Sequence, residues 1–365
     1  MDTVLALDIG TEYIKAALAR ANKSHLEIVG TGKAKQEPGS MWNGTISDIP
    51  AVVAACEKAI VSAEEQSEKR ASAVVVGIAG ELVKGNTTAV HYTRENPNKP
   101  ITESEMDEII KKVQQKSGEV AKETVALETG NNSIEIRLIN SAIVSLTIDG
   151  YKINNPIGFK GSDVVIQFYT AFAPLVHIAA IEKVCAELNL DLIAVAVEPF
   201  AVCRACLGDN LNSNFSGIIM DIGSCTTDVA VINDGGIIGT ETFNIGGKNA
   251  NANPKIWLAG VEVALEDIKT TNTLPNNIWL CGGSAGLPNL QEALALSNWY
   301  QNLPFTKRPL VDLITPDTLP DLNIKTELGP DFVTAIGLLR VGTDVISNQS
   351  EENHLKDKIS KLLQK

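Results

Sequence analysis

One short pattern occurs twice in this chain, first at the amino-terminal end and again beyond the middle. Leu5 to Thr11 reads LALDIGT, and Ile218 to Asp228 reads IIMDIGSCTTD. In each copy an apolar run ends in Asp-Ile-Gly, hydroxyl residues follow, and a second apolar run comes next. This pattern predicts a strand-turn-strand unit with the glycine in the turn. The repeat therefore limits the chain to folds whose two halves begin alike.

The two predicted turns carry groups that suit a polyphosphate. Glycine allows backbone N–H groups to approach phosphate oxygens closely, and neighbouring hydroxyl groups add donors. Asp8 and Asp221 end the two strands, where a carboxylate can hold a hydrated Mg²⁺. The added hydroxyl donors are Thr11, Ser224, Thr226 and Thr227. Facing each other, the two turns would clamp a triphosphate.

Two further motifs lie at informative places along the chain. Gly282, Gly283 and Ser284 follow the apolar run from Ile278 to Cys281, and their small size lets a flat base approach the backbone. Glu198 directly precedes Pro199 in a predicted strand-to-helix turn, a position that suits a carboxylate orienting an attacking water. Each motif is weak alone, because an Asp-x-Gly is more often a plain turn and such a glutamate is more often a solvated helix start. Their order is the specific signal.

This order resembles that of the superfamily of actin, sugar kinases and heat-shock chaperone ATPases. The resemblance implies an α/β, actin-like ATPase fold with two ribonuclease-H-like lobes and with ATP and Mg²⁺ bound between them. It assigns catalytic roles to Glu198 and Asp221, and metal binding to Asp8 and Asp221. The nucleotide-binding residues that it implies are Asp8, Gly10, Thr11, Lys15, Gly223, Ser224, Thr226, Thr227, Gly246, Gly247, Gly282, Gly283 and Ser284.

Within the superfamily the chain resembles the bacterial cell-division protein family FtsA, and the related pilus assembly family PilM shares the layout. The segments that carry this resemblance are NGTISDIPAVVAACEKAI, VVVGIAGELV, ITESEMDEII and IDGYKINNPIGFKG. The resemblance implies an inserted α+β subdomain in the first lobe. The expected divisions are 1–80 and 162–210 (first lobe), 81–161 (insert), 215–247 and 278–343 (second lobe), 248–277 (a reduced covering subdomain) and 344–365 (linker and terminal helix).

Three departures from the FtsA pattern bear on activity. Only Lys248 to Asn277 separate Gly247 from the adenosine motif, so the subdomain that covers the nucleotide is nearly absent. Glu12 stands where Ser or Thr is usual and adds negative charge near the phosphates, which Lys15 has to offset. Cys225 replaces a glycine in the second turn and restricts it. We expect a nucleotide binder or, at most, a slow ATPase.

Local patterns predict the main elements. Val4 to Asp8 and Ile14 to Ala19 form a hairpin, Leu26 to Thr31 extends it, and Ala73 to Ile78 is a buried strand. Ser47 to Glu65 is a helix capped by Asp48, and another helix begins near Ile101, with Thr102 and Glu105 at capping-box spacing. Further predictions are strands at Ser133 to Leu138 and Ala142 to Asp149, a helix at Ile256 to Ile268, and a linker at Asp209 to Asn214.

Charge and composition indicate where the protein works. The formal net charge of -13 disfavours nucleic acid as a partner. No secretory leader is visible in MDTVLALDIG and no run approaches the ~20 apolar residues of a membrane span, so we expect a cytoplasmic protein, with a peripheral position on the inner face of the membrane. His354 to Lys365 (HLKDKISKLLQK) is basic and amphipathic, which is typical either of a membrane-surface helix or of a frayed surface helix.

Three functions remain open at this point. The first is an FtsA-like scaffold that polymerises head to tail, with itself and the tail peptide of the tubulin-like protein FtsZ as partners, in division. The second is a PilM-like adaptor whose insert captures a peptide of a membrane protein. The third is a small-molecule kinase, which is the least favoured because no catalytic-base aspartate stands out in the first lobe beyond the nucleotide.

Overall fold

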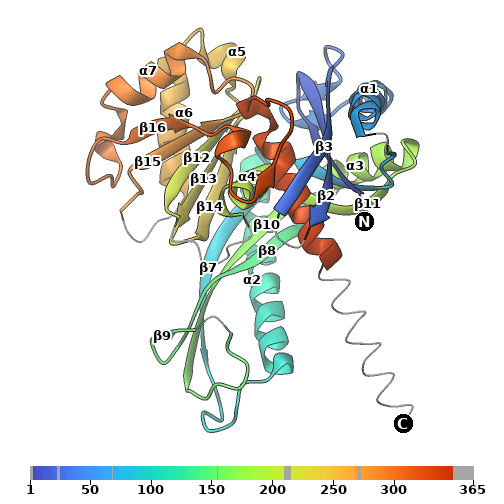
Figure 1. Cartoon of the computed structure of the whole chain (residues 1–365). Helices are drawn as coiled ribbons and strands as arrows, with labels where there is room; N and C mark the ends of the chain where they lie inside the picture. The colour runs from blue at the N-terminus through green and yellow to red at the C-terminus, as the bar shows by residue number, and fades with distance from the viewer. Residues whose placement is uncertain are drawn as a thin grey trace, which may run out of the picture.

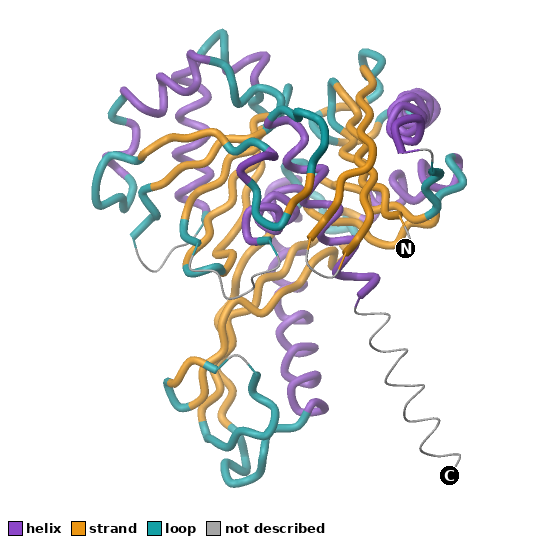
Figure 2. The backbone as a smooth tube through the Cα atoms, viewed as in Figure 1, coloured by secondary structure: helices purple, strands orange, loops and turns teal. Residues whose placement is uncertain are grey.

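A computed structural model of the protein describes residues 3–22, 25–67, 69–153, 155–208, 215–268 and 273–347. The predicted linker at 209–214 and the terminal helix at 354–365 lie outside these residues. Figure 1 shows two lobes side by side, with an elongated unit projecting below them. Strands run through all three parts, and helices flank them (Figure 2).

The first lobe is built on a six-stranded sheet of order β11-β6-β1-β2-β3-β17. β1 (Thr3–Ile9), β2 (Tyr13–Asn22) and β3 (His25–Lys35) are antiparallel neighbours, whereas β6 (Ala73–Ile78) and β11 (Asp191–Val197) continue the sheet parallel to β1. α1 (Ile49–Ser67) and α3 (Leu175–Glu187) belong to this lobe. The short β4 (Met41–Trp42) and β5 (Thr45–Ile46) form a separate hairpin. β17 (Leu322–Asn323) returns from late in the chain to pair with β3.

The second lobe repeats this topology. β12 (Gly217–Ile222), β13 (Thr227–Asn233) and β14 (Gly236–Phe243) are antiparallel, and β15 (Asn277–Cys281) and β16 (Leu310–Leu313) run parallel to β12. Both sheets therefore have the order 3-2-1-4-5 that defines a ribonuclease-H-like lobe. The helices of this half are α5 (Gly247–Ala250), α6 (Pro254–Asp267) and α7 (Pro288–Leu296), with 3₁₀ turns η1 (Trp299–Asn302), η2 (Pro316–Thr318) and η3 (Pro330–Phe332). The predicted α/β fold of two related lobes is confirmed.

The projecting unit contains α2 (Glu103–Thr129), β7 (Lys84–Thr93), β8 (Ile136–Ile148), β9 (Tyr151–Lys152) and β10 (Asp163–Pro174). Its strands extend the sheet of the second lobe, because β7 pairs with β14 at Asn86–Gly239 and Gly85–Thr240. β10 lies between β7 and β8. Residues 163–174, which the sequence-based division gives to the first lobe, thus lie in the sheet of the insert, and we propose that the insert extends to Pro174.

Several local predictions are confirmed and others need correction. The hairpin, the Asp48-capped helix and the strand Ala73–Ile78 are present. The strands predicted at Ser133 to Leu138 and Ala142 to Asp149 are largely confirmed, but the break between them is wrong, because both belong to one continuous strand, β8. β8 pairs with β10 with two register shifts.

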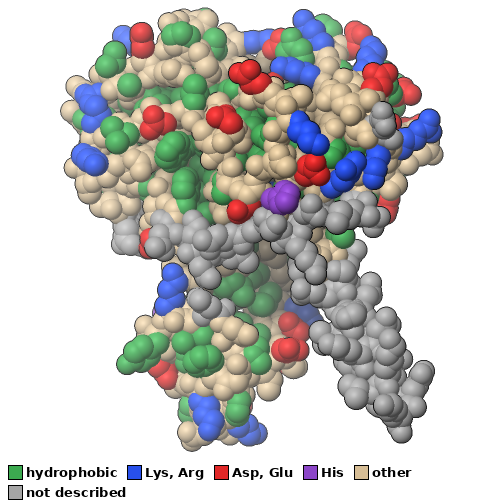
Figure 3. All heavy atoms as spheres, viewed as in Figure 1, with side chains coloured by type: hydrophobic (Ala, Val, Ile, Leu, Met, Phe, Trp, Pro, Cys, Tyr) green, Lys and Arg blue, Asp and Glu red, His purple; other side chains and the backbone are tan. Residues whose placement is uncertain are grey.

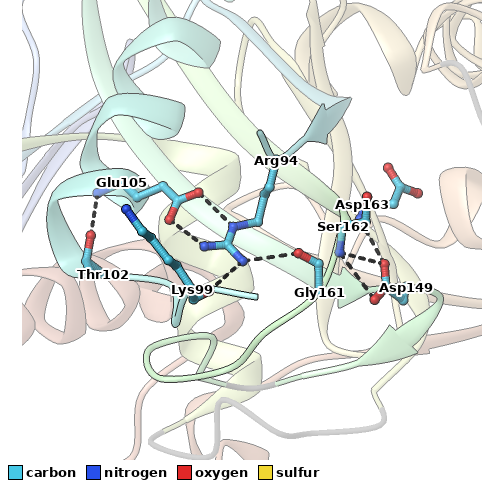
Figure 4. Close-up of polar contacts among 8 residues, drawn as sticks. All are labelled: Arg94, Lys99, Thr102, Glu105, Asp149, Gly161, Ser162 and Asp163. Atoms are coloured by element: carbon cyan, nitrogen blue, oxygen red, sulfur yellow. Dashed lines mark hydrogen bonds and ion pairs between the residues drawn. The ribbon is translucent and has the colours of Figure 1, made fainter. Parts of the chain in front are cut away.

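The predicted capping box at the start of α2 is only half formed. The backbone N–H of Glu105 donates to the Thr102 hydroxyl at 3.2 Å, as expected of an N-cap. The Glu105 carboxylate does not return to Thr102 but accepts two hydrogen bonds from Arg94, at 2.7 and 2.9 Å (Figure 4). Arg94 also donates to the carbonyls of Lys99 and Gly161. A buried arginine with these four bonds fixes the far end of the insert.

Close backbone packing joins the remaining helices to the sheets. Gly30 and Gly32 of β3 face α1 so closely that a Cβ at either position would collide with the carbonyl oxygen of Ala63 or Ala59. The helix over residues 333–347 packs in the first-lobe core, and a Cβ at Gly337 would collide with the backbone of Ala201 in α4 (Glu198–Leu207). The last described helix and α4 therefore lie in backbone contact.

Candidate functional site

The two repeated hairpins have the same internal register. In the first hairpin Asp8 lies opposite Lys15 across the β1–β2 pair, and in the second Asp221 lies opposite Asp228 across β12–β13. Each turn lies between an aspartate that ends one strand and a residue seven positions later. Lys15 and Asp228 therefore hold equivalent places, which makes one half of the site cationic where the other is anionic.

The turns face each other across a cleft of about 140 Å³ that is open to solvent. Residues of both lobes line it. From the predicted set these are Asp8, Gly10, Thr11, Lys15, Glu198, Asp221, Gly223, Ser224, Thr226, Gly283 and Ser284. The fold thus brings together residues that are more than two hundred positions apart in the chain.

Lys15 is the cation at the floor of the cleft. Its ammonium group is 2.7 Å from a carboxylate oxygen of Asp8, and the two side chains are 13% and 5% exposed. Burial alone would lower the pKa of Lys15, but the charge and hydrogen bond of Asp8 raise it above its ordinary value. The lysine is therefore charged at neutral pH and can share its protons between Asp8 and an incoming anion.

Carboxyl groups are crowded around this lysine. Burial raises the pKa of Glu198 well above its ordinary value, and Asp8, Asp228 and Asp221 raise it further. Burial likewise raises the pKa of Asp221, whose carboxylate accepts a hydrogen bond from Thr334, and raises that of Asp228 to about 8. The charges of Asp8, Asp221 and Glu198 all act on this one lysine, and a divalent cation would stabilise carboxyl groups placed so near one another.

The donor set fits a magnesium ion bound together with phosphate. Within the described part of the chain, no group of three or more His, Cys, Asp or Glu side chains converges as a ready metal cage. Mg²⁺ in phosphate-transfer sites is usually held by one or two carboxylates, waters and the phosphates themselves. Asp8 and Asp221 supply such a pair, one from each lobe.

Some predicted residues support the cleft without lining it. Thr227 is fully buried, and its hydroxyl donates to the carbonyl of Ile245 at 2.8 Å and accepts from the indole of Trp257, so it is not available to a phosphate. Gly246 lies behind the second turn, where a Cβ would meet the Cys225 nitrogen at 2.5 Å. The N–H of Gly247 donates to the carbonyl of Gly223 at 2.9 Å.

The adenosine motif is divided in the same way. Gly282 has a φ of +93° and lies beneath Asp221, so a side chain there would collide with the carboxylate. Gly283 and Ser284 reach the cleft, and the Ser284 hydroxyl fills the space in front of Gly247. Gly282 therefore serves close packing against Asp221, and the surface of the cleft in this region consists of Gly283 and Ser284.

Sequence reasoning did not place several residues that line the cleft. Asp228 could have been found from the shared register of the two hairpins. Lys33 and Asp331 form an ion pair of 2.7 Å across the cleft, and no local motif announces a contact between residues so distant in sequence. The other lining residues are Ile9, Tyr13, Gly44, Ala79 and Glu12, of which Glu12 was expected near the phosphates from the sequence.

Comparisons with known proteins support this reading of the fold. The chain is 24% identical to the cell division protein FtsA of Streptococcus pneumoniae over 242 residues, which is 66% of this chain and 49% of that protein. It is also 24% identical to FtsA of Neisseria meningitidis over 247 residues, 67% of this chain and 55% of that protein. The chain spans about half the length of the curated relatives that it matches. No family model matches it.

Among solved structures, the PilM–PilN type IV pilus biogenesis complex includes a chain that superposes with a TM-score of 0.65 at 16% identity. The superposition covers 93% of this chain and 98% of the other. At 16% identity, this structural similarity shows a shared fold and nothing about function. Taken with the two lobes of identical strand order and the paired turns, these findings show that the chain has an actin-like fold like that of the PilM–PilN complex chain and is similar in sequence to FtsA.

Proposed function

We propose that this protein is an FtsA-like, ATP-binding actin homologue that acts in cell division as a polymerising scaffold linked to the membrane. The observation that carries this proposal is the pair of Asp-x-Gly turns of equal register facing each other across one cleft. The sequence similarity to FtsA supports the division role.

The cleft residues divide naturally into roles toward Mg²⁺ and ATP. The backbone N–H of Gly10 and the hydroxyls of Thr11, Ser224 and Thr226 would bind the phosphates, and Lys15 would neutralise them. The N–H of Gly223 instead closes the second turn, because it donates to the carbonyl of Thr226 at 2.9 Å. Asp8 and Asp221 would hold Mg²⁺ through water. Glu198, whose pKa burial raises well above its ordinary value, would orient an attacking water once the metal and nucleotide lower its proton affinity. Hydrolysis would be slow.

The insert is the surface that we assign to partners, including a second copy of this chain. Figure 3 shows hydrophobic side chains gathered on the visible face of the insert, with Lys and Arg at its lower end. Tyr151, Ile157 and Phe159 are large apolar residues of this unit that remain exposed. Exposed apolar groups of this kind are typical of protein contacts. The proposed partners are a neighbouring copy and a short tail peptide of an FtsZ-like protein.

We place the protein in the cytoplasm, peripheral to the inner face of the membrane. No helix in the described residues is long and apolar enough to cross a membrane. Contact with lipid is assigned to the basic amphipathic segment His354 to Lys365.

Electron microscopy on vesicles of mixed neutral and anionic lipid tests the scaffold role. We expect filaments with Mg²⁺ and ATP, and their loss in Phe159→Asp, because a buried charge would disrupt an apolar contact. Val61→Asp on α1 is the control, since it places the same charge on another exposed apolar position. The absence of filaments from the unmodified chain would refute the scaffold role, and filaments that form equally in Phe159→Asp would refute the assignment of the contact to the insert.

A second candidate is a PilM-like adaptor that binds a peptide of a membrane protein. The near-complete coverage of the PilM–PilN complex chain favours it, whereas the FtsA relatives are about twice as long as the matched region. A protein that stays monomeric with Mg²⁺ and ATP but binds a membrane-protein peptide would support this second function.

A further inference from the structure

Glu12 occupies the mouth of the cleft between the two phosphate turns. Its carboxylate accepts a hydrogen bond from the Ser224 hydroxyl at 2.8 Å, and the same oxygen is 3.6 Å from the ammonium group of Lys248. The backbone carbonyl of Glu12 accepts from the N–H of Gln36 at 2.9 Å. One residue of the first lobe is thus fixed at its backbone and bonded through its side chain to the second lobe.

The partners of Glu12 are groups that would otherwise bind phosphate. Ser224 is the hydroxyl residue of the second turn, and Lys248 follows directly after the Gly246-Gly247 pair. An ionised carboxylate is a pure acceptor, like a phosphate oxygen, and takes the same donors. The Ser224 hydrogen bond lowers the pKa of Glu12 against the effect of burial, and Lys248 and Lys35 lower it further. The group is therefore an anion at neutral pH.

A second contact joins the lobes at the same cleft. Lys33 of β3 pairs with Asp331 of η3, which lies beside Gly283. The ammonium group of Lys33 also lies 4.5 Å from the ring centre of Tyr13. Both contacts connect the first hairpin region to the second lobe across the space that a nucleotide would enter. They hold the lobes together with protein groups alone.

We propose that Glu12 is a built-in competitor of the nucleotide phosphates: its carboxylate holds Ser224 while the cleft is free of nucleotide, and a bound phosphate displaces it. The ligand named here rests on the proposed function, whereas the contact between Glu12 and Ser224 does not. Glu12 then lowers the affinity for the nucleotide and, in the absence of nucleotide, holds the two lobes together through Ser224. A smaller neutral residue at position 12 would leave the Ser224 hydroxyl of the second turn available to a phosphate.

Titration calorimetry with Mg²⁺ and ATP tests the competition. Glu12→Ser removes the competing anion and its repulsion of phosphate, so we expect its affinity to exceed that of the unmodified protein by about tenfold or more, the equivalent of one charge-assisted hydrogen bond. Glu12→Gln, which keeps the shape but not the charge, should fall between the two. Glu37→Ser is the matched control, because it removes a nearby exposed carboxylate that lies outside the cleft.

Amide hydrogen exchange without nucleotide gives an independent measure. We expect faster exchange at residues 223–226 in Glu12→Ser than in the unmodified chain or Glu37→Ser. Equal ATP affinities in all four proteins, with unchanged exchange, would overturn the role of Glu12 and leave ATP binding intact. If no protein binds ATP but exchange still rises in Glu12→Ser, the contact is real, and the proposed nucleotide function and the competition both fail.

Discussion

At the scale of single residues, the site is organised by Lys15, which is largely removed from water, and by the carboxyl groups of Asp8, Asp221 and Glu198 that act on it. Lys15 is held by Asp8, and both side chains are largely removed from water. Removing one partner of a buried ion pair strongly destabilises the folded protein, because the remaining charge is left without a partner and without solvent. The polar core of the cleft therefore depends on Lys15 even without a ligand.

Lys15→Met should lower the free energy of unfolding by roughly 3–5 kcal/mol, since it leaves Asp8 without its cation. Lys33→Met is the control. Its ion pair with Asp331 is 41% exposed on the lysine side, and pairs of that kind contribute about 0–1 kcal/mol. Chemical denaturation of both variants measures the difference. Equal losses would contradict the account of a tightly coupled Asp8–Lys15 pair.

Asp228 should make stability depend on pH. Burial raises its pKa from 3.8 to about 8, so between these values the folded protein holds a proton that the unfolded chain has lost. The stability contributed by this group is therefore complete at low pH and declines as the pH rises toward 8. Asp228→Asn removes this decline and retains an acceptor for Thr242. Its melting temperature, relative to that of the unmodified protein, should rise from pH 5 to 8 without metal or nucleotide; parallel profiles would disprove the shift.

Sequence patterns located residues that line the cleft where the signal was local. Asp8, Gly10 and Gly223 were found because each belongs to a short motif that occurs twice. Thr227 shared the same motif, yet its hydroxyl turns to Ile245 and Trp257, since neighbouring strand positions point to opposite faces. The Lys33–Asp331 contact depends on how the two lobes meet, which no window of sequence contains.

At the scale of elements, glycine permits the close contact between β3 and α1. Neither Gly30 nor Gly32 has a positive φ, so the requirement is for space and not for an unusual backbone. The strand predicted from Leu26 to Thr31 was correct in place but extends to Lys35. The pattern of apolar residues located it, while the contact with the helix that explains the glycines was visible only in three dimensions.

Gly32→Ala should destabilise the protein by about 1–3 kcal/mol, because the added methyl group collides with the carbonyl oxygen of Ala59 and the strand and helix have to separate. Gly286→Ala is the matched control: a Cβ there meets nothing within 4 Å, and its φ is not positive. Urea denaturation compares the two variants. A Gly32→Ala protein as stable as the control would show that this contact is looser than described.

Elements of the insert were the least predictable. Neither β7 nor β10 was expected, because β7 reads KGNTTAVHYT and lacks a continuous apolar run. β7 gains stability from pairing with β10 on one side and β14 on the other, and β10 from pairing with β7 and β8, so their formation reflects distant partners more than local preference. The helix predicted near Ile101 was located correctly, but α2 continues to Thr129, where Gly130 ends it in a left-handed conformation.

At the scale of the whole molecule, the chain crosses between the lobes more than once. β17 returns to the first sheet, and the helix over 333–347 packs beside α4 while its Thr334 hydrogen-bonds Asp221 of the second lobe. Arg204 of α4 pairs with Asp344 at 2.8 Å. These connections set the two hairpins opposite each other. The cleft is thus a product of the complete topology, and the repeat in the sequence predicted its two sides but not its width.

A crystal structure of the full chain with Mg²⁺ and a non-hydrolysable ATP analogue tests the central claim most directly. The account predicts phosphates between the Gly10–Thr11 and Gly223–Thr226 turns, the metal next to Asp8 and Asp221, and the Glu12 carboxylate released from Ser224. A nucleotide bound elsewhere, or a cleft in which Glu12 still holds Ser224 at saturating nucleotide, would contradict it.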